Sequence, residues 1–166
     1  MKIEDTFDKY HRAVFDFVYR LTHRADLAED ITQECFLVLV RAPDRFTPDR
    51  GSMQTYLFSI ARNLVLKEYR DHKAVESTES IESDLATDPC LALEISSAVE
   101  SAVAGLPHLQ REALVLFQYE GLALEEIAYV VGADVGTVKS RLYRARERLR
   151  RELAPLRNAG GVHGTV

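Results

Sequence analysis

The residues best suited to a chemical role are cations that crowd a short stretch near the C-terminus. Residues 135–153 carry seven basic and two acidic side chains, although the whole chain has a formal net charge of −5. Lysine and arginine at this density on one helix suit a polyanion, and a cationic helix is a form that enters the DNA major groove. A solvated charged face is the plainer alternative. The cations are Lys139, Arg141, Arg144, Arg146, Arg148, Arg150 and Arg151.

The residues around these cations predict a helix-turn-helix. Apolar spacing predicts a first helix over 124–131, and Gly132 follows where the backbone must turn sharply. Asp134 is placed to cap a second helix over 135–153. The buried stripe of that second helix is predicted to hold Val138, Leu142, Ala145 and Leu149.

A second candidate site lies in the loop 42–52 and the helix predicted to follow it over 53–72. The loop contains Phe46, and the helix carries Tyr56 among basic residues. An aromatic ring can stack on an unpaired base while cations hold the phosphates, so this combination suits single-stranded nucleic acid. The alternative, equally open from the sequence, is that Phe46 and Tyr56 are core aromatics.

The remaining reactive residues do not form a catalytic or metal-binding pattern. The five histidines are scattered without a His-x-x-His pair, and the chain has no nucleophile motif or phosphate-binding loop. Cys35 lies on an apolar helical stripe, and a redox role for Cys90 stays open. We therefore expect neither an enzyme nor a cofactor, metal or small-molecule substrate. A polar N-terminus and the lack of a long apolar run predict a cytoplasmic protein without membrane insertion.

The positioning elements are all predicted to be helices, which makes the fold class all-α. Residues 75–104 hold seven acidic and no basic side chains, and residues 75–88 have the composition of a flexible acidic linker. That linker separates two small helical domains, the second of which contains the helix-turn-helix. The predicted domains are 1–74 and 89–154, with a flexible tail over 155–166. The other predicted helices span 4–22, 27–41, 89–104 and 107–119, with Asp26, Ser52 and Asp88 as N-caps.

Taken together, these motifs resemble the extracytoplasmic-function (ECF) group of bacterial sigma factors. The segments DLAEDITQECF (26–36) and RGSMQTYLFSIARNLV (50–65) are similar to sigma region 2, and residues 105–153 are similar to region 4. The resemblance covers about 150 residues of the chain. It implies a subunit that binds core RNA polymerase and promoter DNA and directs transcription initiation, with an anti-sigma factor as a further partner for a stress- or envelope-related regulon.

The resemblance also implies roles for individual positions. The face that docks on the polymerase clamp helices matches Asp30, Gln33 and Glu34. The residues that capture and melt the −10 element match Arg45, Phe46, Tyr56, Arg62 and Asn63. The recognition helix for the −35 element matches Thr137, Lys139, Ser140, Arg141 and Arg144.

Two alternatives belong to other functional classes. The segment 67–74, KEYRDHKA, is less basic than the matching segment of the family, which would suit a sigma mimic that sequesters an anti-sigma factor. A helix-turn-helix transcriptional regulator with a helical sensor domain would explain the second domain alone. It leaves the segments DLAEDITQE and IARN without a role.

Overall fold

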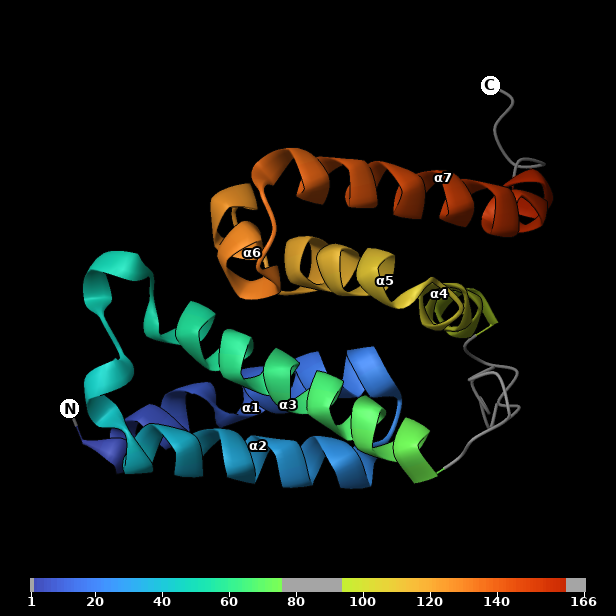
Figure 1. Ribbon diagram of the computed structural model, residues 1–166. Coiled ribbons are helices and arrows are strands. Elements are labelled where there is room, and N and C mark those ends of the chain that lie inside the picture. Colours follow the sequence, from blue (N-terminus) through green and yellow to red (C-terminus); the bar gives the residue numbers. More distant parts are fainter. Residues whose placement is uncertain (1, 76–93, 161–166) are drawn as a thin grey trace.

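The computed structural model describes residues 2–75 and 94–160, and these residues form helices and turns without a strand. Figure 1 shows two layers, with α1, α2 and α3 in one and α4, α5, α6 and α7 in the other. We call these the N-terminal unit and the C-terminal unit. The all-α fold class with a helix-turn-helix is confirmed. The predicted linker after Val75, Cys90 and the cap at Asp88 lie outside the described residues.

The N-terminal unit is built from three amphipathic helices. They are α1 (Ile3–Thr22), α2 (Ala25–Arg41) and α3 (Met53–Val75), and each packs on the other two. Their shared core contains Phe17 and Phe58, which are fully buried with ring centroids 4.9 Å apart. Burying a side chain of this size contributes about 1.5–3 kcal/mol, so the three apolar stripes are enough to bring the helices together.

Between α2 and α3 the chain makes two short turns, η1 (Pro43–Arg45) and η2 (Pro48–Arg50). The prolines begin these turns, as expected of residues that cannot continue α2. The backbone N–H of Thr55 donates to the Ser52 hydroxyl at 3.1 Å, which confirms the predicted cap of α3. The loop is therefore held at both ends by well-defined helix termini.

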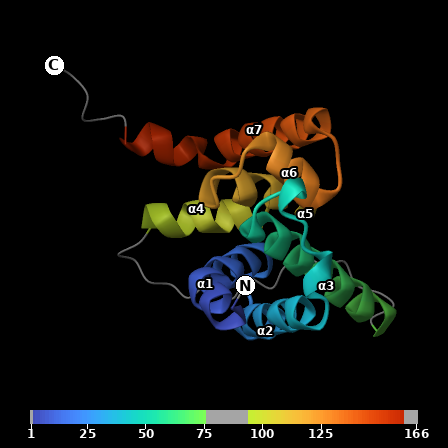
Figure 2. The same ribbon diagram turned by 90° about the vertical axis from the view of Figure 1, so that its left-hand side faces the viewer.

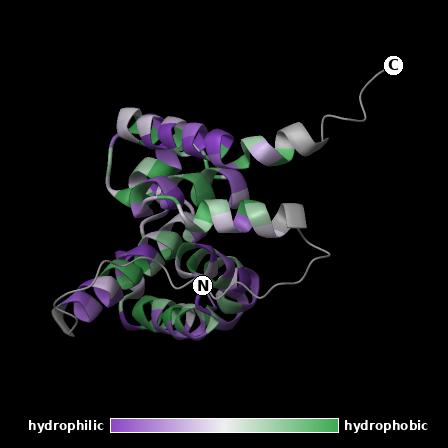
Figure 3. Ribbon diagram, turned by 90° about the vertical axis from the view of Figure 1, so that its right-hand side faces the viewer, coloured by the Kyte–Doolittle hydropathy of each residue, from purple (hydrophilic) through white to green (hydrophobic). Residues whose placement is uncertain are grey.

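The C-terminal unit packs four helices around a second set of buried residues. They are α4 (Glu94–Ala104), α5 (His108–Leu114), α6 (Leu124–Val131) and α7 (Val135–Gly160), with a π-helical turn η4 (Val115–Tyr119) after α5. Helix α7 packs on α4, α5 and α6. In Figure 3 the outer side of α7 is coloured mainly as hydrophilic, which fits its row of cations.

Three local predictions differ from the structure. Helix α2 begins one residue before Asp26, with Arg24 at its N-cap, because Asp26 instead pairs with Arg24 at 3.1 Å from within the first turn. Helix α7 continues through Pro155 to Gly160, beyond the predicted end of the domain. Pro155 lies inside this helix and has no N–H to donate, so one hydrogen bond of the helix is missing there. Leu109, on the apolar face expected for the predicted helix 107–119, is 45% exposed.

The two units pack against each other. Helix α6 packs along α3, and α1 contacts α4, α5 and η4. The turned view in Figure 2 also shows α5 and α6 next to the α1 and α3 side of the N-terminal unit. Buried apolar residues of both units belong to one continuous cluster. In this structure the two units are therefore packed together, and we call this packing the closed arrangement.

Candidate nucleic-acid interface

The helix-turn-helix has the geometry that its residue spacing predicts. Gly132 adopts a left-handed conformation with φ of 67°, and a Cβ added there would meet nothing within 4 Å. Backbone strain alone therefore favours glycine at this turn. Val138 is fully buried and fixes the start of α7 against α6. The turn thus sets the direction in which α7 presents its cations.

Asp134 caps α7 as predicted. The backbone N–H of Thr137 donates to the Asp134 carboxylate at 2.7 Å. This backbone hydrogen bond, helped by the Thr137 side chain, lowers the pKa of Asp134 below its usual value. The cap satisfies one of the unpaired N–H groups at the helix start and orders the turn in front of the recognition residues.

The cations of α7 divide into two groups. Arg148 pairs with Glu152 at 3.1 Å and Arg150 pairs with Glu147 at 2.6 Å. Within residues 2–73 and 97–156, by contrast, Lys139, Arg141 and Arg144 form no ion pair. Among the same residues Arg146 and Arg151 form no ion pair either, so the unpaired group contains the three predicted recognition cations and two others. The charge of the recognition cations is therefore available for a polyanion.

The predicted recognition residues are not equally accessible. Lys139, Ser140 and Arg144 are exposed, whereas Thr137 and Arg141 are half-buried. The Nη1 nitrogen of Arg141 is buried without a hydrogen-bond partner among the described side chains. The guanidinium of Arg141 is therefore held partly by packing, which restricts the directions from which a base edge can meet it.

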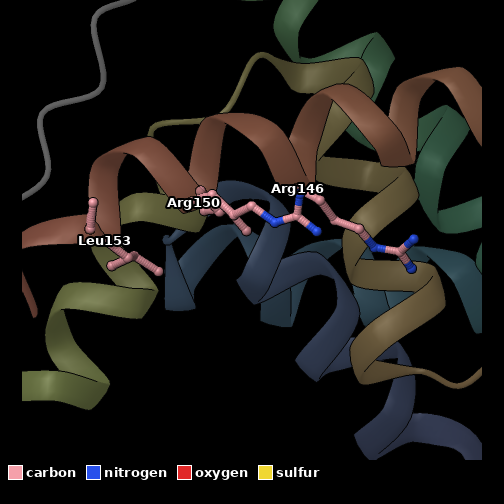
Figure 4. Close-up of a pocket in the computed structure, with 5 residues that line it drawn as sticks. Arg146, Arg150 and Leu153 are labelled. Atoms are coloured by element: carbon pink, nitrogen blue, oxygen red, sulfur yellow. The ribbon is translucent and has the colours of Figure 1, made fainter. Parts of the chain in front are cut away.

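A pocket of about 320 Å³ lies along the same helix but holds none of the predicted recognition residues. Its lining is Leu149, Leu153 and Ala154 together with the stems of Arg146 and Arg150. Figure 4 shows the labelled side chains on one side of α7. Arg146 also lies over the Phe117 ring at 5.1 Å, so it contributes to packing within the C-terminal unit.

The second candidate site, in the N-terminal unit, brings the predicted aromatics together. The rings of Phe46 and Tyr56 lie 5.5 Å apart at an interplanar angle of 47°. Both are half-buried, and Arg45 beside them is exposed. Burial raises the pKa of Tyr56, and the Arg45 charge opposes this rise. The two rings are therefore partly packed in the fold and partly accessible for stacking. This lies between the two alternatives that the sequence left open.

Arg62 and Asn63, predicted to lie on the same surface, have different surroundings. Asn63 is exposed. Arg62 donates two hydrogen bonds across to the C-terminal unit, from Nε to Glu112 Oε2 at 2.9 Å and from Nη2 to Oε1 at 3.0 Å. The Arg62 side chain is 13% exposed and the Glu112 side chain is fully buried. In the closed arrangement Arg62 is therefore engaged by a carboxylate of the other unit.

Glu112 is the residue at this surface that the sequence analysis missed. Desolvation raises the pKa of Glu112, but the hydrogen bonds and charges of His108 and Arg62 outweigh it and hold the pKa below its usual value. A signal existed in the sequence, because Glu112 falls between Leu109 and Leu116 on the apolar stripe of its helix. A carboxylate on such a stripe indicates a buried partner.

The predicted polymerase-docking face lies on α2. Asp30 and Gln33 are exposed, and Glu34 is half-buried and pairs with Arg41 at 3.2 Å. Leu37 and Val40 continue the same face and are 45% and 49% exposed. Neighbouring apolar residues at this exposure are typical of a contact surface, and the sequence analysis did not single them out.

The described residues contain neither a metal-binding cluster nor a membrane-spanning helix. No group of three or more His, Cys, Asp or Glu side chains in the described ranges could hold a metal ion. None of the helices in these ranges is long and apolar enough to cross a membrane.

Comparison with known proteins connects both surfaces to one family. The family model of sigma-70 region 2 matches residues 6–75, and that of sigma-70 region 4 matches residues 96–149. The RNA polymerase sigma-H factor of Pseudomonas aeruginosa is 36% identical over 163 residues, covering 89% of this chain and 84% of the relative. The ECF RNA polymerase sigma factor SigW of Bacillus subtilis is 32% identical over 167 residues, covering 92% and 89%.

A solved structure shares the fold. The sigma factor RpoE of Bartonella quintana, solved in complex with the anti-sigma factor NepR, superimposes with a TM-score of 0.72. It is 27% identical, and the match covers 91% of this chain and 96% of that one.

Proposed function

Because this chain belongs to the ECF group of bacterial sigma factors, we propose that it binds core RNA polymerase and directs it to a specific set of promoters. Residues 1–74 act as the region 2 domain, and residues 89–154 act as the region 4 domain. The observation that carries the proposal is the pairing of a sigma-like cationic helix-turn-helix with a sigma-like aromatic loop in one chain. Sigma factors are not enzymes in the usual sense, since the polymerase carries out the chemistry.

In this proposal α7 recognises the −35 element. Lys139, Arg141 and Arg144 are supported as DNA contacts by their lack of acidic partners in the described part of the chain. Thr137 and Ser140 lie on the same helix turn and add hydrogen-bonding groups. An arginine that reads a guanine edge supplies about 1–3 kcal/mol of discrimination against other bases.

The loop and α3 act on the −10 element. Phe46 and Tyr56 stack on an unpaired base, with Arg45 at the phosphates and Asn63 further along α3. Stacking one base contributes about 1–3 kcal/mol, which is close to the few kcal/mol needed to extract it from the duplex. One base cannot open the promoter alone, so phosphate contacts and the polymerase must contribute to melting.

The exposed face of α2 docks on the polymerase. Asp30, Gln33 and Glu34 provide its polar part, and Leu37 and Val40 extend it with apolar area. Such a mixture suits the core of a protein interface better than charge alone. The protein acts in the cytoplasm, where bacterial polymerase transcribes, and an anti-sigma factor is its regulator, as in the related complex with NepR.

The test is transcription in vitro with purified core polymerase and promoter fragments from the host genome. We expect core binding and transcripts that start at defined promoters only when this protein is present. A protein that binds an anti-sigma factor but neither core polymerase nor a promoter would instead be a sigma mimic. The predicted recognition cations Lys139, Arg141 and Arg144 disfavour that outcome, because a decoy needs no surface for reading bases.

A further inference from the structure

The contact between Arg62 and Glu112 joins a predicted DNA-melting surface to the opposite unit. The two side chains form parallel hydrogen bonds of 2.9 and 3.0 Å, the bidentate geometry that arginine also uses with phosphate. We infer that Glu112 is an internal competitor of nucleic acid, which occupies Arg62 and holds the chain closed when no DNA strand is bound. This inference rests on the proposed function.

The pair gives the closed arrangement one defined orientation. A buried ion pair gains little net stability, because both charges lose their hydration, but a mismatch that leaves one of them unpaired is costly. Only a docking that brings α3 and α5 together at this point gives the fully buried Glu112 carboxylate its Arg62 partner. His108 lies 3.3 Å from the same carboxylate and packs against the Tyr69 ring at 5.6 Å.

Other contacts across the boundary reinforce this orientation. Arg111 of α5 donates to the Leu21 carbonyl at 2.6 Å, at the end of α1 where helix carbonyls lack internal partners. Arg20 lies 4.6 Å above the Tyr119 ring and 3.4 Å from Glu120. Side chains from α1 and α3 thus meet the segment from Arg111 to Glu120 along its length.

The same docking covers more of the proposed melting surface than Arg62 alone. Helix α6 packs along α3, and Tyr129 of α6 is near enough to Tyr56 to affect its ionisation. The unpaired cations of α7, by contrast, are not involved in the boundary. Closure therefore occupies part of the −10 surface and leaves the predicted −35 helix free.

Competition of this kind has a simple quantitative consequence. If the closed form exceeds the open form by about ten to one, the apparent Kd for a strand that needs the open form rises about tenfold. A DNA strand would then pull the chain open, since it binds a surface that the open form makes available. A variant that weakens closure should bind a strand more tightly without any new contact to it.

The test uses two variants of the full chain that weaken closure but change its charge in opposite directions. Glu112→Gln removes the carboxylate that holds Arg62, and Arg20→Ala leaves Glu120 buried without its cation. Compactness is measured by small-angle X-ray scattering. Binding of a fluorescent single-stranded oligonucleotide of mixed sequence is measured by anisotropy without polymerase. We expect both variants to expand and to bind the strand about tenfold more tightly.

Matched controls separate competition from general electrostatics. Glu125→Gln changes the net charge as Glu112→Gln does, but lies at an exposed position of α6, and should leave both readouts unchanged. Adding Arg62→Gln to Glu112→Gln should keep the chain expanded and abolish the gain in strand binding. Arg20→Ala removes a positive charge, so a gain in affinity for a polyanion there has no simple electrostatic origin.

The outcomes that overturn the inference are specific. The inference is refuted if both variants are as compact as the wild type. It is also refuted if the variants expand but bind the strand with unchanged affinity. If Glu112→Gln loses its helical circular dichroism, the Arg20→Ala variant, whose substituted side chain is 37% exposed, decides the question alone. Because these measurements omit polymerase, their failure would leave the transcription assay, and hence the proposed function, unaffected.

Discussion

Arg62 and Arg141 show that residues of the same type can have different roles because their surroundings differ. Both are arginines on amphipathic helices, and the resemblance to sigma factors places both at DNA. Arg62 is matched by a buried carboxylate of the other unit, whereas Arg141 forms no ion pair among the described residues. At this scale the availability of a cation depends on whether the fold supplies an anion.

Arg141→Ala should reduce promoter discrimination more than overall affinity. Loss of a base-edge contact removes about 1–3 kcal/mol of preference for one base pair, which is roughly a 5- to 150-fold loss of selectivity at that position. Competitive binding to −35 elements that differ at single positions measures this directly. Arg148→Ala, whose side chain already pairs with Glu152, should leave the preference intact. Equal effects from the two variants would contradict a recognition role for Arg141.

At the scale of elements, the turn between α6 and α7 depends on one glycine. Gly132→Ala forces a Cβ into a left-handed conformation, which should lower the free energy of unfolding by roughly 1–2 kcal/mol. No neighbour lies within 4 Å of the added Cβ, so the loss reflects backbone strain alone. Urea denaturation followed by circular dichroism measures the change.

Two control variants sharpen this prediction. Gly132→Asn should lose less stability, since asparagine tolerates the left-handed region better than alanine. Gly136→Ala, inside α7, should instead be neutral or slightly stabilising, because alanine favours a helix. A loss at Gly136 as large as at Gly132 would show that strain at the turn is not the cause.

The α2 face makes a prediction about partners. Leu37→Ala should weaken binding to core polymerase by roughly 1 kcal/mol or more, about fivefold in Kd, if this face forms part of the interface core. Leu37 is 45% exposed, so its truncation should leave the melting temperature of the free protein nearly unchanged. Leu109→Ala is the matched control, because Leu109 is also 45% exposed but lies on α5. Binding is measured by fluorescence with labelled core enzyme.

At the scale of the whole molecule, closure should depend on pH through Glu120. Burial raises the pKa of Glu120 to about 7; the Arg20 charge offsets this only in part, and Asp16 adds to the rise. The closed arrangement therefore favours the protonated carboxyl. Its contribution to closure is complete below the ordinary value of 4.5 and is lost as pH rises through about 7.

The chain should consequently expand as the pH rises from about 4.5 to about 7, measured by X-ray scattering. His23 has its pKa lowered by burial and by Arg111, against Glu100, so protonation of His23 opposes closure only below its ordinary value of 6.5. Glu120→Gln should show no expansion as the pH rises over this range. An equal expansion of that variant would assign the pH response to another group.

Much of the fold could be predicted from local patterns. The bounds of α6, the turn at Gly132 and the caps at Ser52 and Asp134 follow from spacing and residue type alone. These features depend on neighbours within a few positions, which is why one sequence is enough to find them. The predicted start of α2 at Asp26 was wrong because a nearby arginine competed for the capping carboxylate.

The residues of the candidate sites could be predicted from the sequence, but the burial and the partners of their side chains could not. The sequence determined the helices, the cationic face of α7 and the likeness to both sigma regions, because each lies in a continuous stretch. The tertiary structure decided that Glu112 is buried against Arg62, fifty positions away. It also decided that α6 covers α3. The energy of such a contact depends on how deeply both groups are buried and on how they pair. A stretch of sequence that contains only one of the two groups shows neither its burial nor its partner.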